Sequence, residues 1–124
     1  VPEKSARFLI LRDGDTVLLQ QRAPSGIWGG LWIPPEIPAH LSPAEVAAEW
    51  GATLQQLRAL PVFRHTFSHF HLDIHGFSGV LSANTTRMMR VRDATTRWQS
   101  LKALDDVGLP APMRRLLDQL EVSS

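Results

Sequence analysis

Phe63-Arg64-His65-Thr66-Phe67-Ser68-His69-Phe70-His71-Leu72-Asp73-Ile74-His75 is the stretch around which the chain is predicted to fold. It reads as two alternating strands that meet at the polar step Ser68-His69, with Phe70, Leu72 and Ile74 on one face of the second strand. The sequence therefore predicts an exposed turn that carries a hydroxyl and an imidazole. Such a turn can read the edge of a flat heterocycle, because serine both donates and accepts hydrogen bonds and histidine adds a donor and a stacking ring.

The opposite face of the second strand carries His71, Asp73 and His75, because alternate residues of a strand point the same way. Three potential metal ligands therefore share one face. Such a triplet is far more often a solvated polar face than a metal centre. We predict no metal site here and assign these residues no role.

The composition is that of one domain spanning residues 1–124. Hydrophobic residues make up 44% of the chain and charged residues 20%, which is enough apolar material for one core. The formal net charge of +1 argues against a general polyanion binder, but residues 58–97 contain six arginines and only two aspartates. This basic region is either a solvated face or a set of contacts to the phosphates of a polyanion backbone, and the candidates for phosphate contact are Arg64, Arg87, Arg90 and Arg92.

The chain contains no cysteine, which excludes disulfides, thiolate metal sites and a cysteine nucleophile. No apolar run approaches the roughly 18 residues that a membrane-spanning helix needs, and no signal-peptide pattern opens the chain. The start Val1-Pro2-Glu3-Lys4 has the character of a linker. We expect a cytoplasmic protein with no membrane contact, of which this chain is one excised domain.

Local patterns predict several elements of secondary structure. Residues 7–12 and 16–22 are consecutive apolar runs around an Asp-Gly turn, typical of a β-hairpin in a sheet that is covered on both faces. A loop should lie between a helix predicted over residues 43–50 and the strand that begins at Phe63, and residues 95–98 should form a last strand. Gly76 and Gly79 suggest a bulge in the strand that continues from residue 71. A C-terminal amphipathic helix is indicated by the stripe Met113, Leu116, Leu117 and Leu120.

Residues 23–36 are predicted to form a shaped loop, because Gly29-Gly30 favours a tight turn and three prolines withdraw backbone donors. Two interpretations of Trp28 are open. Its ring closes one end of the core, or it forms with Gly29 and Gly30 the rim of a binding surface, where the glycines let the backbone approach a ligand closely.

The intervals between Gly30, Glu36 and residues 44–52 match those of a known sequence motif. Ser42-Pro43-Ala44-Glu45 is a capping box that opens a helix over residues 43–50, and Gly51 is placed to end it. Gly30, Glu36 and Ala44-Glu45-Val46-Ala47-Ala48-Glu49-Trp50-Gly51-Ala52 are similar in register to the Nudix box, in which Gly, Glu and Arg-Glu-apolar-x-Glu-Glu-x-Gly-apolar follow at these intervals. The resemblance implies an α/β (α+β) fold with a mixed β-sheet sandwiched between helices.

The Nudix box is degenerate at two positions. Ala44 stands in place of the box arginine, and Ala48 in place of the first of the paired glutamates that hold magnesium against a diphosphate. We therefore expect no catalytic residue and no cofactor in this chain. The alternative is an active Nudix pyrophosphohydrolase that acts on oxidised nucleoside triphosphates through magnesium held by Glu36, Glu45 and Glu49.

Three segments resemble the C-terminal domain of the MutY family of adenine DNA glycosylases: Arg22-Ala-Pro-Ser-Gly-Ile-Trp-Gly-Gly-Leu-Trp32, Phe63-Arg-His-Thr-Phe-Ser-His-Phe-His-Leu72, and Trp98 followed by Gly108-Leu-Pro-Ala-Pro-Met-Arg-Arg-Leu-Leu117. The middle segment is the most specific. The resemblance implies a non-catalytic DNA-repair domain that recognises 8-oxoguanine opposite adenine in double-stranded DNA, with the recognition loop at Phe67, Ser68 and His69. It also implies a separate N-terminal catalytic domain, a glycosidase of base excision repair that hydrolyses the N-glycosyl bond of adenine and carries an iron–sulfur cluster.

Overall fold

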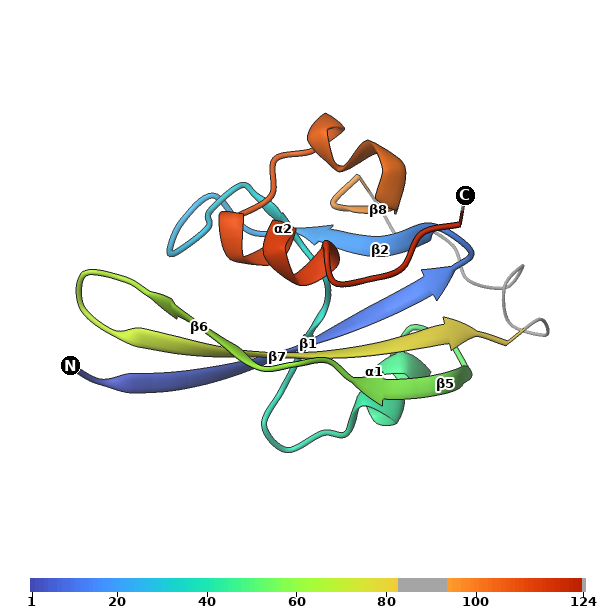
Figure 1. Ribbon diagram of the computed structural model, residues 1–124, viewed down its shortest axis with the longest axis horizontal. Helices are drawn as coiled ribbons and strands as arrows, with labels where there is room; N and C mark the ends of the chain where they lie inside the picture. The colour runs from blue at the N-terminus through green and yellow to red at the C-terminus, as the bar shows by residue number, and fades with distance from the viewer. Residues whose placement is uncertain (83–93, 124) are drawn as a thin grey trace.

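Two long strands, β1 (Glu3–Asp13) and β7 (His71–Leu81), run parallel through the centre of a mixed β-sheet (Figure 1). The computed structural model describes residues 1–82 and 94–123, and within these the sheet has eight strands in the order β3-β2-β1-β7-β5, with β4, β6 and β8 paired to β1, β7 and β2. The other strands are β2 (Thr16–Gln21), β3 (Trp32–Ile33), β4 (Glu36–Ile37), β5 (Leu54–Ala59), β6 (Phe63–Thr66) and β8 (Thr96–Ser100). The helices are α1 (Pro43–Glu49), α2 (Ala111–Leu117) and the 3₁₀ helix η1 (Leu101–Asp106).

Helices α1 and α2 cover opposite faces of the sheet (Figure 1). Phe8 of β1 is buried in one core with Met113 of α2, whereas the next residue, Leu9, is buried in a second core with Val46 of α1. A strand between two apolar layers needs apolar residues on both faces, which explains the consecutive apolar runs of the first hairpin. The predicted mixed sheet sandwiched between helices is confirmed.

Most of the predicted elements are present. The hairpin predicted over residues 7–22 is formed by β1 and β2, and the predicted last strand corresponds to β8. Both α helices are short, and among the described residues no helix is long and apolar enough to cross a membrane. The stripe predicted for the C-terminal helix is buried against the sheet at all four positions, Met113, Leu116, Leu117 and Leu120.

The segment between α1 and β6 is not the loop that the sequence led us to expect. It contains β5, which pairs antiparallel with β7 at the edge of the sheet. Apart from Leu54, the side chains of β5 are exposed, including Gln55, Gln56 and Arg58. An exposed edge strand can be polar on both faces, so it lacks the alternation by which a half-buried strand is found in a sequence.

The expected bulge lies on β5 and not on β7. The pairing register shifts between Gln55 and Arg58, so the extra residue belongs to β5. The glycines of β7 make room for side chains instead. A Cβ on Gly76 would lie 2.5 Å from Cδ1 of the buried Leu116, and Gly79 faces a leucine of β5 in the same way.

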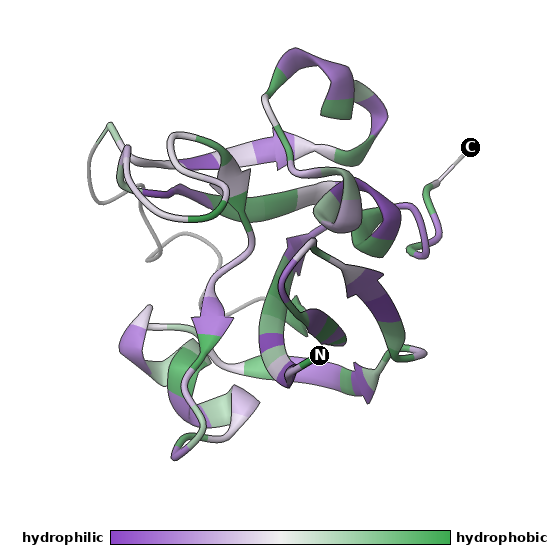
Figure 2. Ribbon diagram, turned by 90° about the vertical axis from the view of Figure 1, so that its left-hand side faces the viewer, coloured by the Kyte–Doolittle hydropathy of each residue, from purple (hydrophilic) through white to green (hydrophobic). Residues whose placement is uncertain are grey.

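Strands β6 and β7 form a hairpin that extends beyond the helices at one end of the molecule, the left of Figure 1. The N-terminal half of β1 lies beside it, with Glu3 paired to His71 and Ser5 to Asp73. Figure 2 looks onto this end of the molecule, with the N-terminus toward the viewer. The parallel register therefore brings the first residues of the chain next to the turn that the sequence singles out.

Candidate functional site

Ser68 and His69 form the exposed tip of the β6–β7 hairpin. The backbone N–H of Phe67 donates to the carbonyl oxygen of Phe70 at 2.8 Å, which closes the turn around these two residues. The predicted exposed turn is therefore present, and its hydroxyl and imidazole are accessible to a ligand.

Aromatic rings support this tip. Phe67 and Phe70 stack with their ring centroids 4.6 Å apart and their planes at 23°. The His65 ring meets Phe67 edge-on at 4.7 Å, and the Trp28 ring lies 6.0 Å from the same phenylalanine. Such pairs contribute about 0.5–1.5 kcal/mol each beyond the area that they bury. The backbone on both sides of the tip is therefore anchored in the absence of a ligand.

The loop that carries Trp28 has an unusual backbone. Trp28 has a φ of +59°, a left-handed conformation that bulky residues rarely adopt. Gly29 packs against its own loop, because a Cβ there would lie 2.6 Å from the carbonyl oxygen of Pro24. The Trp28 ring lies 6.4 Å from the ring of the buried Phe8. Trp28 therefore closes this end of the core, and the close approach that Gly29 permits is internal to the loop.

A cavity of about 350 Å³ lies beside the hairpin. Trp28 and Phe70 contribute to its apolar wall, and its charged lining residues are Lys4, Arg22 and Glu36. Trp28 thus also belongs to the rim of a potential binding site, while Gly29 and Gly30 do not line the cavity. Its volume and aromatic wall suit a planar ring of about the size of a nucleobase.

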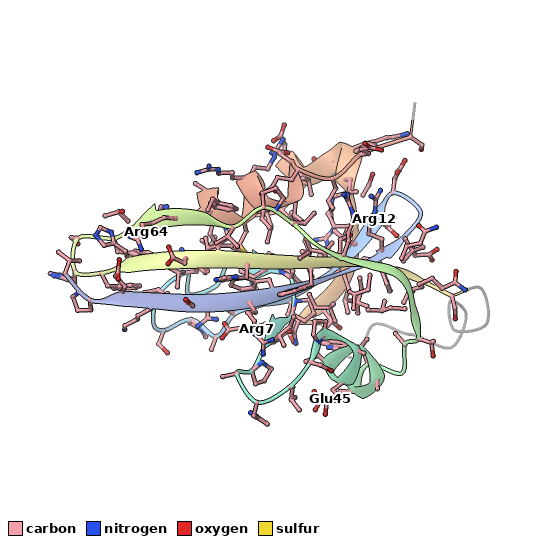
Figure 3. The ribbon with its side chains drawn as sticks, turned by 60° about the horizontal axis from the view of Figure 1, so that its bottom comes forward. Arg7, Arg12, Glu45 and Arg64 are labelled. Atoms are coloured by element: carbon pink, nitrogen blue, oxygen red, sulfur yellow. The ribbon has the colours of Figure 1, made fainter. Side chains whose placement is uncertain are left out.

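Arg64, a predicted phosphate contact, is held by carboxylates within the hairpin end of the sheet (Figure 3). Its Nε and Nη2 donate to the two carboxylate oxygens of Asp73 at 2.8 and 3.2 Å, and Nη2 also donates to Glu3 at 2.7 Å. The bonds to Asp73 are the main cause that raises the pKa of Arg64, and the same bonds lower the pKa of Asp73. Arg64 is thus already paired in this structure. The other three candidates, Arg87, Arg90 and Arg92, lie outside the described residues.

The polar face of β7 has partners of its own. His71 Nδ1 lies 2.8 Å from the hydroxyl of Thr66, and Asp73 binds Arg64. In the described part of the chain, no group of three or more His, Asp and Glu side chains is arranged to hold a metal ion. His75 lines a different cavity, together with Arg7.

Lys4 is a residue of this site that the sequence analysis did not identify. Its Nζ lies 4.5 Å from the ring centroid of Phe70, next to the hairpin tip. The two residues meet only because β1 pairs with β7 in parallel, with Lys4 opposite Leu72. A parallel pairing between distant segments leaves no short-range signal in the sequence, so no local pattern could have indicated this contact.

The helix of the degenerate Nudix box is formed as predicted. The backbone N–H of Ser42 donates to Glu45 at 2.9 Å, and the backbone N–H of Glu45 donates to the Ser42 hydroxyl at 3.1 Å. The bond from the Ser42 backbone is the main cause that lowers the pKa of Glu45. Gly51 follows the helix with a φ of +78°. Glu45 is thus engaged as a cap at the start of α1 (Figure 3).

An arginine from another strand anchors the segment before α1. Arg7 of β1 donates from Nη2 to the carbonyl oxygens of Pro38 and Leu41, at 2.6 Å in both cases (Figure 3). Position 44, where the Nudix box has its arginine, carries only the methyl group of an alanine. The fold of this segment is therefore fixed without the box arginine.

The family model of the NUDIX domain matches residues 6–119 of this sequence. The chain belongs to the Nudix domain family. Similar solved structures come from proteins of different kinds. The C-terminal domain of mouse MUTYH, in a complex with human PCNA, is 19% identical to this Nudix domain, with a TM-score of 0.70 over 92% of this chain and 84% of that chain.

Two other structures match this Nudix domain about as well. The MutT NUDIX hydrolase from Burkholderia pseudomallei is 20% identical, with a TM-score of 0.69 over 98% of this chain and 100% of that chain. Shewanella oneidensis NrtR is 15% identical, with a TM-score of 0.73 over 93% of this chain and 60% of that chain. At these identities the similarity shows the fold alone.

Proposed function

We propose that this Nudix domain recognises 8-oxoguanine opposite adenine in double-stranded DNA, as the C-terminal domain of an adenine DNA glycosylase. The observation that supports the proposal is the exposed pair Ser68-His69 on a hairpin tip that aromatic packing holds in place. A binding group that is already ordered loses little conformational entropy when its ligand arrives. The tip is therefore suited to reading a small chemical difference.

The chemistry of the lesion fits the two side chains at the tip. Oxidation of guanine replaces the N7 acceptor by an N–H donor and adds a carbonyl oxygen at C8. In this proposal Ser68 accepts from the new donor, and the His69 ring or a backbone N–H donates to a neighbouring oxygen. A serine hydroxyl can also donate to N7 of ordinary guanine, so we expect a preference of only about 1–3 kcal/mol, or roughly 5- to 150-fold.

The degenerate Nudix box agrees with a binding role. Ala44 and Ala48 replace two residues of the box, and Glu45 is used in the helix cap. The likeness to the C-terminal domain of mouse MUTYH supports the proposal at the level of the fold, and one structure of NrtR contains a 27mer DNA. In this proposal the chain itself excises nothing, and a separate catalytic domain with its iron–sulfur cluster removes the adenine.

The proposal is tested by titrating the protein with matched duplexes that contain 8-oxoguanine or guanine opposite adenine. We expect tighter binding to the oxidised duplex, and we expect Ser68→Ala to remove most of this preference, with a smaller loss for His69→Ala. Ser25→Ala, at an exposed serine of the loop that carries Trp28, is the matched control and should keep the preference. An equal loss of affinity on both duplexes in Ser68→Ala would contradict specific readout of the lesion.

A hydrolase is the second candidate function, and the cavity beside the hairpin favours it. Trp28 and Phe70 offer aromatic contacts, and Glu36 of the Nudix box lines the same cavity. The test is release of pyrophosphate from 8-oxo-dGTP in the presence of magnesium. Because Ala48 lacks the carboxylate that the box supplies for the metal, we expect no release above background. Release that Glu45→Gln abolishes would support the hydrolase instead.

A further inference from the structure

The cations at the hairpin end of the molecule are not equally available to a ligand. Arg64 is bound by two carboxylates, those of Asp73 and Glu3. A phosphate that approached it would have to compete with both of them. Lys4 is exposed, and within the described residues no carboxylate is paired with it. Lys4 therefore offers an approaching ligand an available positive charge next to the tip.

Lys4 is also held in place. Its ammonium group lies over the face of Phe70, 4.5 Å from the ring centroid, and Phe70 in turn stacks on Phe67 at 4.6 Å. A cation–π contact orients an ammonium group without neutralising its charge. The three side chains form one stack that continues directly into the Ser68-His69 tip, so the position of the charge is tied to the position of the tip.

We infer that Lys4 contacts a phosphate of the DNA backbone next to the base that Ser68 and His69 read. This inference rests on the proposed function. A lysine on a phosphate adds affinity and fixes the register of the protein on the duplex, but it carries no information about the base. Ser68 and His69 therefore distinguish the oxidised base from guanine, and Lys4 positions the protein on the duplex through its charge.

The salt dependence of DNA binding tests the separate role of Lys4. Lys4→Gln should weaken binding to the oxidised and the ordinary duplex by the same factor, about 3- to 10-fold, and should reduce the slope of log K against log salt concentration by about 0.9, the value for one released counterion. Lys4→Arg keeps the charge and the ring contact and should restore both quantities. Lys102→Gln is the matched control, because Lys102 is also exposed but is paired with Asp15 beside η1. Unchanged affinity and slope in Lys4→Gln would overturn the inference.

Amine footprinting provides a second measurement, because the chain contains only two lysines, Lys4 and Lys102. Acetylation of wild-type protein with and without duplex should show protection of Lys4 and not of Lys102. Equal reactivity of Lys4 in both samples would overturn the inference, even if the oxidised duplex is still preferred. If Lys4 is protected but the protein does not distinguish the two duplexes, the phosphate contact stands and lesion recognition fails. If no duplex binds, both fail.

Discussion

Arg64 joins three strands, because it lies on β6 and its partners Asp73 and Glu3 lie on β7 and β1. All three side chains are on the surface, where an ion pair contributes little to global stability. The effect of the ion pairs of Arg64 should therefore be confined to the hairpin. By holding the polar face of the hairpin while the aromatic rings hold the other face, Arg64 restricts the position of the Ser68-His69 tip.

Asp73→Asn should therefore loosen the tip without unfolding the protein. We expect lower NMR order parameters at Ser68 and His69, and a nearly unchanged free energy of unfolding. Because Arg64 lowers the folded-state pKa of Asp73, the contact is fully present above the ordinary aspartate pKa of about 3.9 and is lost as the pH falls through the lower folded value. In the wild type the tip should loosen only below about pH 4, and in Asp73→Asn this pH dependence should disappear. A tip equally ordered in both proteins would contradict the role of Arg64.

Part of this site could be predicted from the sequence. A hairpin whose tip is Ser68-His69 places Arg64 directly opposite Asp73, so their pairing follows from the register alone. The exposure of the tip could be predicted from the alternation of apolar and polar residues in the two strands, which breaks at Ser68-His69. The contacts of Glu3 and Lys4 did not, because they depend on which distant strand lies next to the hairpin.

At the scale of elements, α1 is stabilised both by its N-terminal cap and by packing of its inner face. It has seven residues, fewer than an isolated helix needs to be stable in water. Its first turn is fixed by the reciprocal bonds of Ser42 and Glu45, and its inner face is fixed by Val46 and Ala47 in the core. The bonds at the cap are local, and the packing of the inner face supplies the rest.

Ser42→Ala should lower the free energy of unfolding by about 1 kcal/mol, because the backbone N–H of Glu45 in the first turn would lose its acceptor. Urea denaturation measures this loss. Ser42→Asp keeps an acceptor at the cap and should recover most of it, and Ser25→Ala should have little effect. A loss in Ser42→Asp as large as in Ser42→Ala would show that the hydroxyl has another role.

The elements that were predicted correctly share strong local signals. The first hairpin has an Asp-Gly turn, α1 has a capping box, and α2 has a stripe of apolar residues at helical spacing. The elements that were missed lack such signals. β5 is an exposed edge strand, and β3 and β4 have two residues each. The sequence predicts a bulge on β7, because glycines are common at bulges. Gly76 and Gly79 instead leave space for leucine side chains of α2 and β5, and no local pattern indicates that packing.

At the scale of the whole molecule, the same strands of the sheet line both cores. Leu18 and Leu19 are consecutive residues of β2, both fully buried, yet they belong to the core under α1 and the core under α2 respectively. Neither core can be lost without exposing the other side of the same strands. The spacing of the Nudix box was sufficient to predict this architecture, whereas the recognition role of the hairpin tip stays a prediction.

Leu18→Ala and Leu19→Ala should each lower the free energy of unfolding by about 2–5 kcal/mol, the range for large-to-small changes in a well-packed core. Both variants should unfold in a single transition, with tryptophan fluorescence and far-UV circular dichroism changing together. Separate transitions in either variant would show that the two layers are independent. Ser25→Ala, at an exposed serine outside both cores, is the mild comparison.

The parallel pairing of β1 with β7 has a consequence for how the protein is made. β1 leaves the ribosome first, but its long partner follows only after α1, β5 and β6 have been synthesised. Closing so large a loop of unordered chain is entropically slow compared with forming a turn between neighbouring strands. On a nascent chain we therefore expect the β6–β7 turn to assemble early and β1 to pair with β7 after it. The central pairing of the sheet then depends on a hairpin that is completed only after β1 itself has been made.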